Sequence, residues 1–542
     1  MKFKSLLSAL TTVTTIGFVV SFIVIFQQLK ASLIHIKANE YIHYKMTRLL
    51  FQSLQGIFYQ WLELTVLISI GLTIIWLLSK LALSLFLKTH LKYRIKWHSF
   101  KIKRKNKAKI LMPIIKTFII LVLILAFINF GFFLENKIYK PHKPNVILIV
   151  CETLRADHLG YNGYKRNTTP NLDSLAKQAF LFKNAYSQAP STRPSMWNIV
   201  TSKYQSPMPA PDSYLTIAEY FKSNRYKTAA FISQQFLKAT KSNLDQGYDL
   251  YDADCLKDKH GLSLRRANSI TDAAINWIKK DRNWPYFIWL VYFDPHDPYI
   301  PPDEFKGIYT KSENFSRDRR GEKIHMKTSP IHPEHRQFLI NAYDEEIRYF
   351  DYELGRLLRW LKNSGQFDNT IIAFTADHGE ELGDNGHRWD HSQLLSQEEI
   401  WIPLIIKLPH QQHQTIITEP VQNIDIYPTL VDYFSPHHLP SFSKTLEGKS
   451  LLPLMRKEKS LPLQYALSLW QGQRCLIIGN YKYWLQSKEE SLINIKTREE
   501  INDPARLNKF REELNKILNQ YIKKRGYYKK NLEQLKSLGY LK

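Results

Sequence analysis

The sequence predicts an α/β protein with a largely parallel sheet flanked by helices. Three continuous apolar runs, residues 145–150, 286–293 and 370–375, are typical of buried strands in such a sheet. Residues 344–362 lie between the second and third runs and space their apolar side chains at helical intervals. Strands that alternate with a helical segment in this way favour a parallel sheet covered by helices.

Three further apolar runs near the N-terminus are each long enough to span a bilayer, at residues 6–26, 65–87 and 111–134. Lys80 and Lys116 interrupt the second and third of them close to one end, where a lysine side chain can extend to the membrane surface. A cleaved signal peptide is the alternative for the first run, but no convincing A-x-A site follows it. We therefore expect three transmembrane helices ahead of the α/β domain.

The loop between the second and third membrane runs carries ten Lys and Arg residues and no acidic residue. The positive-inside rule places such a loop in the cytoplasm, so that the N-terminus lies inside and everything after residue 134 lies outside. We therefore expect a multi-pass protein of the cytoplasmic (inner) membrane, with the α/β domain on the extracytoplasmic side.

The formal net charge of +26 belongs mostly to the N-terminal part of the chain. Residues 1–145 hold 21 Lys and Arg against three Glu, a net charge of +18, which leaves +8 for the other 397 residues. A basic loop between two spans meets anionic lipid head groups more readily than nucleic acid, so we expect no nucleic-acid partner. The three cysteines are far apart in the sequence and indicate no disulfide framework.

Composition divides the chain into four parts. A basic linker with two prolines, residues 137–144, separates a membrane domain of residues 1–136 from a domain of residues 145–455. Residues 456–542 change to short strand-like pieces followed by a polar helical tail, and predict a small C-terminal α+β subdomain. The apolar stripe of that tail, within residues 507–521, is spaced for packing against a neighbouring element.

Polar side chains directly follow all three predicted strands, at residues 151–158, 294–297 and 377–381. Glu152 comes after the first, and Asp377 and His378 come after the third, in a tight turn next to a glycine. Open α/β sheets bind ligands at the carboxyl ends of their strands. Glu152 alone also fits a solvated loop residue. Two carboxylates and an imidazole, joined by a hydroxyl group, nevertheless suit a divalent cation such as zinc or manganese.

The segment STRPSM, residues 191–196, places three hydroxyl groups around Pro194, just ahead of another apolar run. The simplest interpretation is a helix capped by Ser or Thr, with the proline in its first turn. A hydroxyl group at a helix start beside a metal ion is also well placed to form an alkoxide, which makes Thr192 a candidate nucleophile. His296 and His391 are candidates to hold the oxygens of a transferred anion, although each alone also fits a structural histidine.

Nine segments, in order between residues 144 and 541, resemble the sulfatase family of the alkaline phosphatase superfamily. They are PNVILIVCETLRADHLGYNGY, TTPNLDSLA, FDPHDPYIPP, YDEEIRYFDYELGRLLRWL, IIAFTADHGEELGDNG, WIPLIIKLP, IDIYPTLVDYF, LEGKSLLPLM and LKSLGYL. The resemblance implies an alkaline-phosphatase-like fold with a central, largely parallel sheet and a smaller C-terminal sheet. It also implies a metal and a substrate site, with Glu152, Thr192, Asp377 and His378 as metal ligands, Thr192 as the nucleophile, and His296 and His391 as substrate contacts.

The chain departs from the sulfatase pattern at two positions. Sulfatases carry C-x-P-S-R or S-x-P-S-R, whose first residue is oxidised to formylglycine, whereas residues 192–196 read TRPSM here. Thr153 replaces the second acidic residue of the sulfatase Asp-Asp pair. A formylglycine hydrate can expel sulfate by collapsing to the aldehyde, and a threonine sulfate ester has no such exit. A phosphothreonine, in contrast, can be discharged by water or by a second alcohol.

The threonine, the E-T-x-R start and the membrane spans resemble the phosphoethanolamine and phosphoglycerol transferases of bacterial envelopes. The first expectation is therefore transfer of a phosphoethanolamine-like head group from a membrane phospholipid, through a covalent Thr192 intermediate, to an envelope glycan or lipid. The alternative is hydrolysis of a sulfuric or phosphoric ester, which the downstream segments favour. A catalytically dead membrane sensor or lipid-binding protein is a minor alternative. The expected cofactor is a divalent metal, zinc first, with manganese or calcium as alternatives.

Overall fold

The computed structural model describes residues 143–204, 214–257, 263–280, 284–310, 332–384, 389–435, 441–458 and 462–537. The chain divides into two compact units, Met1–Tyr139 and Lys140–Lys542. The three expected membrane spans and the basic loop lie in the first unit, outside the described residues. Within the described part, no helix is both long and apolar enough to cross a membrane.

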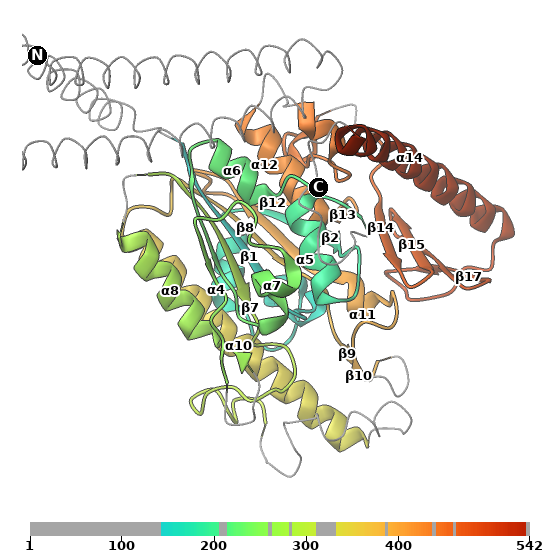
Figure 1. The fold of residues 1–542 in the computed structure, drawn as a ribbon. Helices are drawn as coiled ribbons and strands as arrows, with labels where there is room; N and C mark the ends of the chain where they lie inside the picture. Colours follow the sequence, from blue (N-terminus) through green and yellow to red (C-terminus); the bar gives the residue numbers. More distant parts are fainter. Residues whose placement is uncertain are drawn as a thin grey trace, which may run out of the picture. The chain divides into compact units, whose positions relative to one another are not determined.

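A nine-stranded sheet forms the centre of the second unit (Figure 1). Its strand order is β12-β2-β11-β8-β1-β7-β3-β4, with β13 also paired to β2. The strands are β12 (Thr415–Ile417), β2 (Phe180–Tyr186), β11 (Trp401–Lys407), β8 (Thr370–Ala376), β1 (Asn145–Cys151), β7 (Tyr286–Tyr292), β3 (Lys227–Phe231), β4 (Leu250–Asp252) and β13 (Val421–Gln422).

The three predicted strands are confirmed as β1, β7 and β8, which are neighbours at the middle of the sheet. β1 pairs in parallel with β7 on one side and with β8 on the other. Every residue of β7 and β8 is buried, because helices cover both faces of the sheet. The sheet is largely parallel, as predicted, with the exception of β11, which runs antiparallel to both of its neighbours, β8 and β2.

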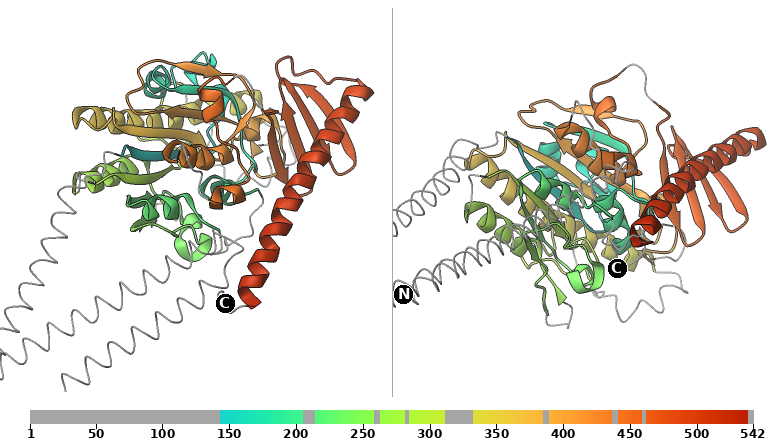
Figure 2. Two further views of the ribbon diagram at one scale, coloured as in Figure 1. Left: turned by 90° about the horizontal axis from the view of Figure 1, so that it is seen from above. Right: turned by 45° about the horizontal axis from the view of Figure 1, so that its top comes forward.

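Helices cover the two faces of the sheet as separate groups (Figures 1 and 2). One face carries α4 (Pro170–Ala176), α8 (Ala267–Lys280) and α10 (Pro333–Asn363), and the other carries α5 (Thr192–Thr201), α6 (Ile217–Ser223) and α12 (Ile426–Phe434). The helix predicted for residues 344–362 is the second part of α10, which starts with a proline at Pro333, a residue suited to a first helical turn.

Short elements connect these layers. The helices are α7 (Ala239–Ser242), α11 (Gln397–Ile400) and α13 (Leu452–Met455), and the 3-10 turns are η2 (Ala156–His158), η3 (Gly160–Asn162), η4 (Gln235–Leu237), η5 (Asn423–Asp425) and η6 (Ser441–Thr445). Two small hairpins pair β5 (Leu256–Lys257) with β6 (Ser263–Leu264) and β9 (Glu381–Leu382) with β10 (Trp389–Asp390).

The C-terminal region folds as an antiparallel sheet with a helix along it (Figure 2). Its strands are β14 (Ala466–Trp470), β15 (Gln473–Ile478), β16 (Tyr481–Gln486) and β17 (Glu489–Asn494), and its helix is α14 (Pro504–Ser537). Phe510, Leu514 and Ile517 of α14 are buried against the sheet residues Leu476 and Tyr483. The expectation of a packing face on the helical tail is therefore confirmed.

The small sheet is attached to the end of β2, close to the start of α5. The Leu469 N–H donates to the Gln188 carbonyl at 2.9 Å, and the Ser468 hydroxyl donates to the Ser187 carbonyl at 2.6 Å. These bonds hold the segment that leads from β2 to Thr192. The small sheet therefore fixes the approach to the helix start on which the candidate nucleophile lies.

Candidate active site

The candidate metal ligands lie at the carboxyl ends of adjacent strands. Glu152 follows β1, and Asp377 and His378 follow β8, the direct neighbour of β1. All three side chains are fully buried. The topology thus brings together carboxylates that are more than 200 residues apart in the sequence, as the pattern of polar residues after strands predicts.

Thr153 joins the two strand ends through its backbone. Its N–H donates to Asp377 Oδ1 at 3.1 Å, and the His378 N–H donates to the same oxygen at 2.8 Å. Thr153 has a φ of 53°, in the left-handed region that β-branched residues rarely adopt. Its backbone therefore orients Asp377, although its side chain cannot supply the carboxylate found in sulfatases.

Each of the two candidate carboxylate ligands has one buried oxygen that accepts no hydrogen bond from any described residue. These oxygens are Glu152 Oε1 and Asp377 Oδ2, the second of which lies 3.4 Å from His378 Nε2. Glu152 Oε2 accepts a short hydrogen bond from Gln234. Burial raises the pKa of Glu152 well above its usual value, and repulsion from Asp377 raises it further. Buried acceptors without a donor fit a divalent cation, which would relieve both desolvation and repulsion.

Thr192 is the first residue of α5 and faces His378. Its Oγ1 lies 3.3 Å from His378 Nε2. The other ring nitrogen, Nδ1, lies 2.7 Å from the Gly379 carbonyl, so Nδ1 carries the proton and Nε2 the lone pair. Burial lowers the pKa of His378 and favours this neutral form. The Nε2 lone pair can therefore bind a metal, or accept the proton of the Thr192 hydroxyl.

The expected helix start is confirmed, but the hydroxyl groups of Ser191 and Ser195 have surroundings that differ from those of Thr192. The Ser191 side chain occupies the N-cap position and caps no backbone N–H. Ser195 is fully buried and donates to the Asp377 carbonyl at 2.6 Å. Thr192, half-buried, is thus the hydroxyl of this segment that contacts the imidazole of His378.

Of the two candidate substrate histidines, His391 lies beside His378, and His296 lies beside His391. The ring centre of His391 is 4.5 Å from that of His378 and 5.0 Å from that of His296. His391 Nδ1 lies 3.3 Å from Glu380 Oε1 and 3.5 Å from Asp390 Oδ1. Burial opposes a charge on His391, but Glu380 and Asp390 outweigh it and raise its pKa to about 9. His391 is therefore a cation at neutral pH, suited to an anion.

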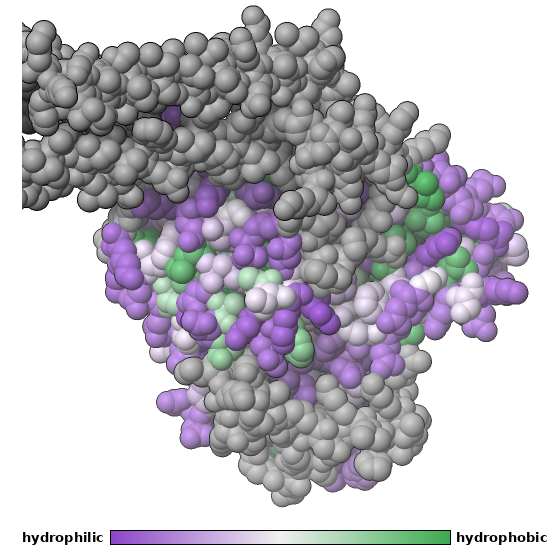
Figure 3. Space-filling view, viewed as in Figure 1, coloured by the Kyte–Doolittle hydropathy of each residue, from purple (hydrophilic) through white to green (hydrophobic). Residues whose placement is uncertain are grey.

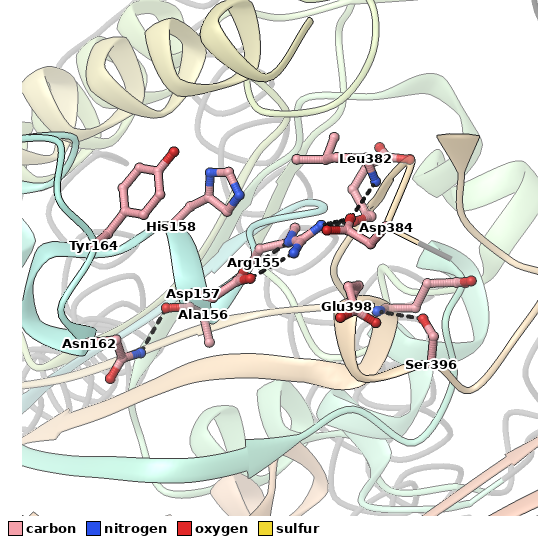
Figure 4. A network of polar contacts seen from close by, with 12 residues as sticks. Arg155, Ala156, Asp157, His158, Asn162, Tyr164, Leu382, Asp384, Ser396 and Glu398 are labelled. Atoms are coloured by element: carbon pink, nitrogen blue, oxygen red, sulfur yellow. Dashed lines mark hydrogen bonds and ion pairs between the residues drawn. The ribbon is translucent and has the colours of Figure 1, made fainter. Parts of the chain in front are cut away.

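Arg155 contacts the segment that follows Asp377 and His378, and Figure 4 shows its ion pairs with Asp157 and Asp384. Its guanidinium donates to the Glu380 carbonyl at 3.1 Å and to Asp384 at 2.5 Å, and it also pairs with Asp157. Gly379 lies so close to the next loop that a Cβ there would stand 2.0 Å from the Glu398 carbonyl oxygen. The glycine after the histidine is therefore required by a close backbone approach.

Sequence reasoning assigned no role to three residues of this site: Gln234, Asp294 and Glu380. Asp294 follows β7 and is almost fully buried, with an oxygen that no described group satisfies. The position of Asp294 directly after a predicted strand is the sequence feature that points to this residue. Glu380 adjoins the recognised turn, but nothing in the sequence pairs it with His391. Gln234 follows β3, a strand too short to be recognised from its apolar pattern.

Comparison with solved structures relates this fold to ester hydrolases. A phosphonate monoester hydrolase of Agrobacterium radiobacter superimposes with a TM-score of 0.57 at 17% identity, over 70% of this chain and 96% of that one. A second, from Silicibacter pomeroyi, gives a TM-score of 0.55 at 21% identity, over 70% and 96% of the two chains. At these identities the likeness concerns the fold alone, an alkaline-phosphatase-like α/β architecture.

The sulfatase family model matches residues 144–436, and the chain belongs to the sulfatase family. The chain is 26% identical to an ulvan-active sulfatase of Formosa agariphila, over 54% of this chain and 62% of that protein. It is 25% identical to an arylsulfatase of Clostridium perfringens, over 59% and 79%, and 28% identical to the multifunctional alkaline phosphatase superfamily protein PehA of Trinickia caryophylli, over 35% and 41%. The match thus spans less than two thirds of the first of these relatives.

Membership of this family makes the chain an enzyme of a superfamily that includes sulfuric ester and phosphonate monoester hydrolases. Enzymes of the family typically depend on a divalent metal. The unsatisfied oxygens of Glu152 and Asp377 agree with that requirement.

Proposed function

We propose that the chain is a metal-dependent hydrolase of phosphoric or sulfuric esters, phosphoric esters first, with Thr192 as the nucleophile. The observation that carries the proposal is the contact of Thr192 Oγ1 with His378 Nε2, at 3.3 Å, beside two buried carboxylates with unsatisfied oxygens. A hydroxyl group, an imidazole and carboxylates in one largely buried site are the groups that nucleophilic ester cleavage requires.

Glu152, Asp377, His378 and Thr192 would hold the metal in this proposal. Two carboxylates and one imidazole suit zinc, which we place first, and manganese or calcium are the alternatives. When bound, the cation supplies positive charge that lowers the pKa of the Thr192 hydroxyl and offsets the charge of the ester oxygens.

The proposed reaction proceeds in two displacement steps. Thr192 Oγ1 forms a bond to phosphorus while the bond from phosphorus to the departing alcohol oxygen breaks, and the alcohol leaves with a proton. Water then attacks the phosphothreonine, the bond to Thr192 Oγ1 breaks, and phosphate is released. Each step exchanges one phosphorus–oxygen bond for another, so no oxidant or reductant is needed.

Threonine at position 192 is the reason for placing phosphoric esters ahead of sulfuric esters. A sulfated threonine lacks the aldehyde exit that formylglycine provides, whereas a phosphothreonine is open to attack by water or an alcohol. His391, cationic at neutral pH, and the adjacent His296 would bind the non-bridging oxygens of the ester. A positive histidine at that place also disfavours neutral substrates.

Transfer is the second candidate. In it, an alcohol of an envelope glycan or lipid replaces water in the second step, and a membrane phospholipid donates its head group. Thr192 and the three N-terminal apolar runs support this version, which would act at the extracytoplasmic side of the cytoplasmic membrane. The relatives found by comparison are named as hydrolases and sulfatases, so hydrolysis takes the first place.

The test is the intact mass of the full-length chain after brief exposure to zinc or manganese and p-nitrophenyl phosphate. We expect the wild type to gain one phosphoryl group and Thr192→Ala to gain none. Ser191→Ala, a change of the adjacent hydroxyl, is the matched control and should gain the same mass as the wild type. Both candidates share the covalent first step, so a parallel incubation with phosphatidylethanolamine and an added sugar alcohol separates them by the product. The hydrolase releases free phosphoethanolamine, whereas the transferase forms a phosphoethanolamine ester of the added alcohol.

A mass gain on Thr192→Ala would rule out Thr192 as the carrier of the intermediate. Turnover of p-nitrophenyl sulfate without a phosphoryl adduct would instead favour sulfuric esters.

A further inference from the structure

An exposed aromatic side chain lies close to two cations, one of which directly follows the candidate nucleophile in the sequence. Phe236 is 51% exposed. The Arg193 guanidinium lies 6.0 Å from the centre of its ring, and Lys241 Nζ lies 5.4 Å from it. Both cationic side chains are exposed. We call Phe236, Arg193 and Lys241 the rim patch.

The rim patch is attached to the catalytic residues on two sides. Arg193 follows Thr192 directly and belongs to the first turn of α5. Phe236 comes two residues after Gln234, whose side chain holds Glu152 from the opposite direction. Residues that adjoin the candidate site in the sequence at two separate points, after Thr192 and after Gln234, thus come together in the rim patch, within 6.0 Å of one another at Arg193 and Phe236.

The charges of the patch are available to a ligand. Neither Arg193 nor Lys241 forms an ion pair with a carboxylate in the described ranges. Figure 3, in the orientation of Figure 1, shows mostly hydrophilic residues, with apolar ones among them, on the face where α5 and α7 lie. Two unneutralised cations around one exposed phenyl ring form a surface that attracts negative charge.

Stability alone gives a weak reason for this arrangement. Each cation gains from the Phe236 ring, but the two like charges near one ring repel each other, and about half of the Phe236 surface stays in water. A ligand that brings a negative group to the cations and an apolar ring to Phe236 would offset the repulsion and bury the exposed surface.

We propose that the rim patch binds the alcohol portion of the substrate, and selects esters whose alcohol carries a second negative group beside a ring. Multiply phosphorylated or sulfated sugars have this chemistry. The inference rests on the proposed function, because Thr192 fixes where the ester group lies. It adds a specificity site outside the residues that would contact the metal or the transferred anion.

The test measures binding, separately from turnover, to the full-length chain that carries Thr192→Ala. The probes are glucose 6-phosphate against glucose 1,6-bisphosphate, and glucosamine 6-sulfate against glucosamine 2-N,6-O-disulfate, titrated by calorimetry. Phe236→Ala, Arg193→Gln and Lys241→Gln are each added to this chain. Tyr352→Ala and Arg359→Gln are the matched controls, because they dissect an exposed cation–aromatic pair of α10 with the same 6.0 Å spacing.

We expect the doubly charged sugars to bind more tightly than the singly charged ones. Arg193→Gln and Lys241→Gln should each weaken the doubly charged probes by about three- to five-fold, and the singly charged probes less, as expected for partly exposed ion pairs. Phe236→Ala should weaken all four probes by about two- to ten-fold. The controls should change no affinity. Preference for the phosphate or the sulfate pair identifies the source of the negative group.

Two results would overturn the proposal: equal losses of affinity for the singly and doubly charged probes, or no loss of affinity in any rim variant. The patch would then be a surface contact that affects stability only. The two proposals fail separately. A wild-type chain that forms no adduct on Thr192 refutes the nucleophile but leaves these affinities measurable. An adduct together with unchanged affinities refutes the rim patch alone.

Discussion

Replacing Glu380 with glutamine should lower the pKa of His391 and so narrow the pH range of activity. The folded-state pKa of His391 is about 9, against an ordinary value of 6.5. This difference corresponds to about 3 kcal/mol, since each pKa unit is about 1.4 kcal/mol. Because the pKa is raised, the stabilisation is fully present below about pH 6.5 and is lost as the pH rises through 9. Glu380 is the largest cause that raises it, ahead of Asp390 and Asp377.

Two measurements follow for Glu380→Gln. The alkaline limit of kcat/KM, expected near pH 9 in the wild type, should move down by about 1–2 pH units, since burial then dominates the pKa of His391. In urea unfolding of the metal-free chain, the variant should lose about 1–2 kcal/mol at pH 7 and nothing at pH 10, where His391 is neutral in both proteins.

Glu490→Gln is the control for this experiment. Glu490 pairs with Arg511, which does not titrate in this range, so any loss of stability there should be the same at pH 7 and pH 10. If the alkaline limit of Glu380→Gln coincides with that of the wild type, or if its loss of stability is equal at the two pH values, then the pairing of Glu380 with His391 does not set the charge of the site.

Three further changes test other parts of the structure. Removal of metal with EDTA should abolish turnover and lower the melting temperature. Zinc added at one hundred times its Kd should then raise the free energy of unfolding by about 2.7 kcal/mol. Full turnover by the EDTA-treated chain would contradict the metal site. Gly379→Ala should destabilise the protein by about 2–3 kcal/mol and reduce activity, because the new Cβ would meet the Glu398 carbonyl. If the variant unfolds at the same urea concentration as the wild type, the loops that carry Gly379 and Glu398 separate easily. Leu514→Ala should lower the free energy of unfolding in urea by about 3 kcal/mol, because Leu514 is buried between α14 and the small sheet; a loss below 1 kcal/mol would mean that α14 contributes little to stability.

The middle of the fold could be predicted from the sequence because its strands are buried on both faces. β1, β7 and β8 are continuous apolar runs, and such runs are hard to mistake. The outer strands β3 and β4 are short, and β12 and β13 have two or three residues, so their periodicity carries little information. The direction of β11 depends on its partners, β2 and β8, which no local pattern reveals.

The candidate site shows the same division between local and long-range information. Glu152, Asp377 and His378 could be found because each follows an apolar run, and Thr192 because it opens a helix. The hydrogen bond from Gln234 to Glu152 and the ion pair of Glu380 with His391 depend on how separate loops meet in space. The charge of His391 could not be predicted either, since it results from burial and two carboxylates acting together.

The pairing of β1 with β7 and β8 also determines when the site can form during folding. β1 ends at Cys151, whereas its partners begin at Tyr286 and Thr370, so both pairings close loops of more than 130 residues. Contacts of such sequence separation are slow to form, because the entropy of loop closure opposes them until the sheet is nearly complete. During synthesis, the carboxylate of Glu152 emerges long before that of Asp377. A chain interrupted before β8 therefore holds Glu152 and Thr192 but lacks Asp377 and His378, so the candidate site stays incomplete until the segment after β8 has been made.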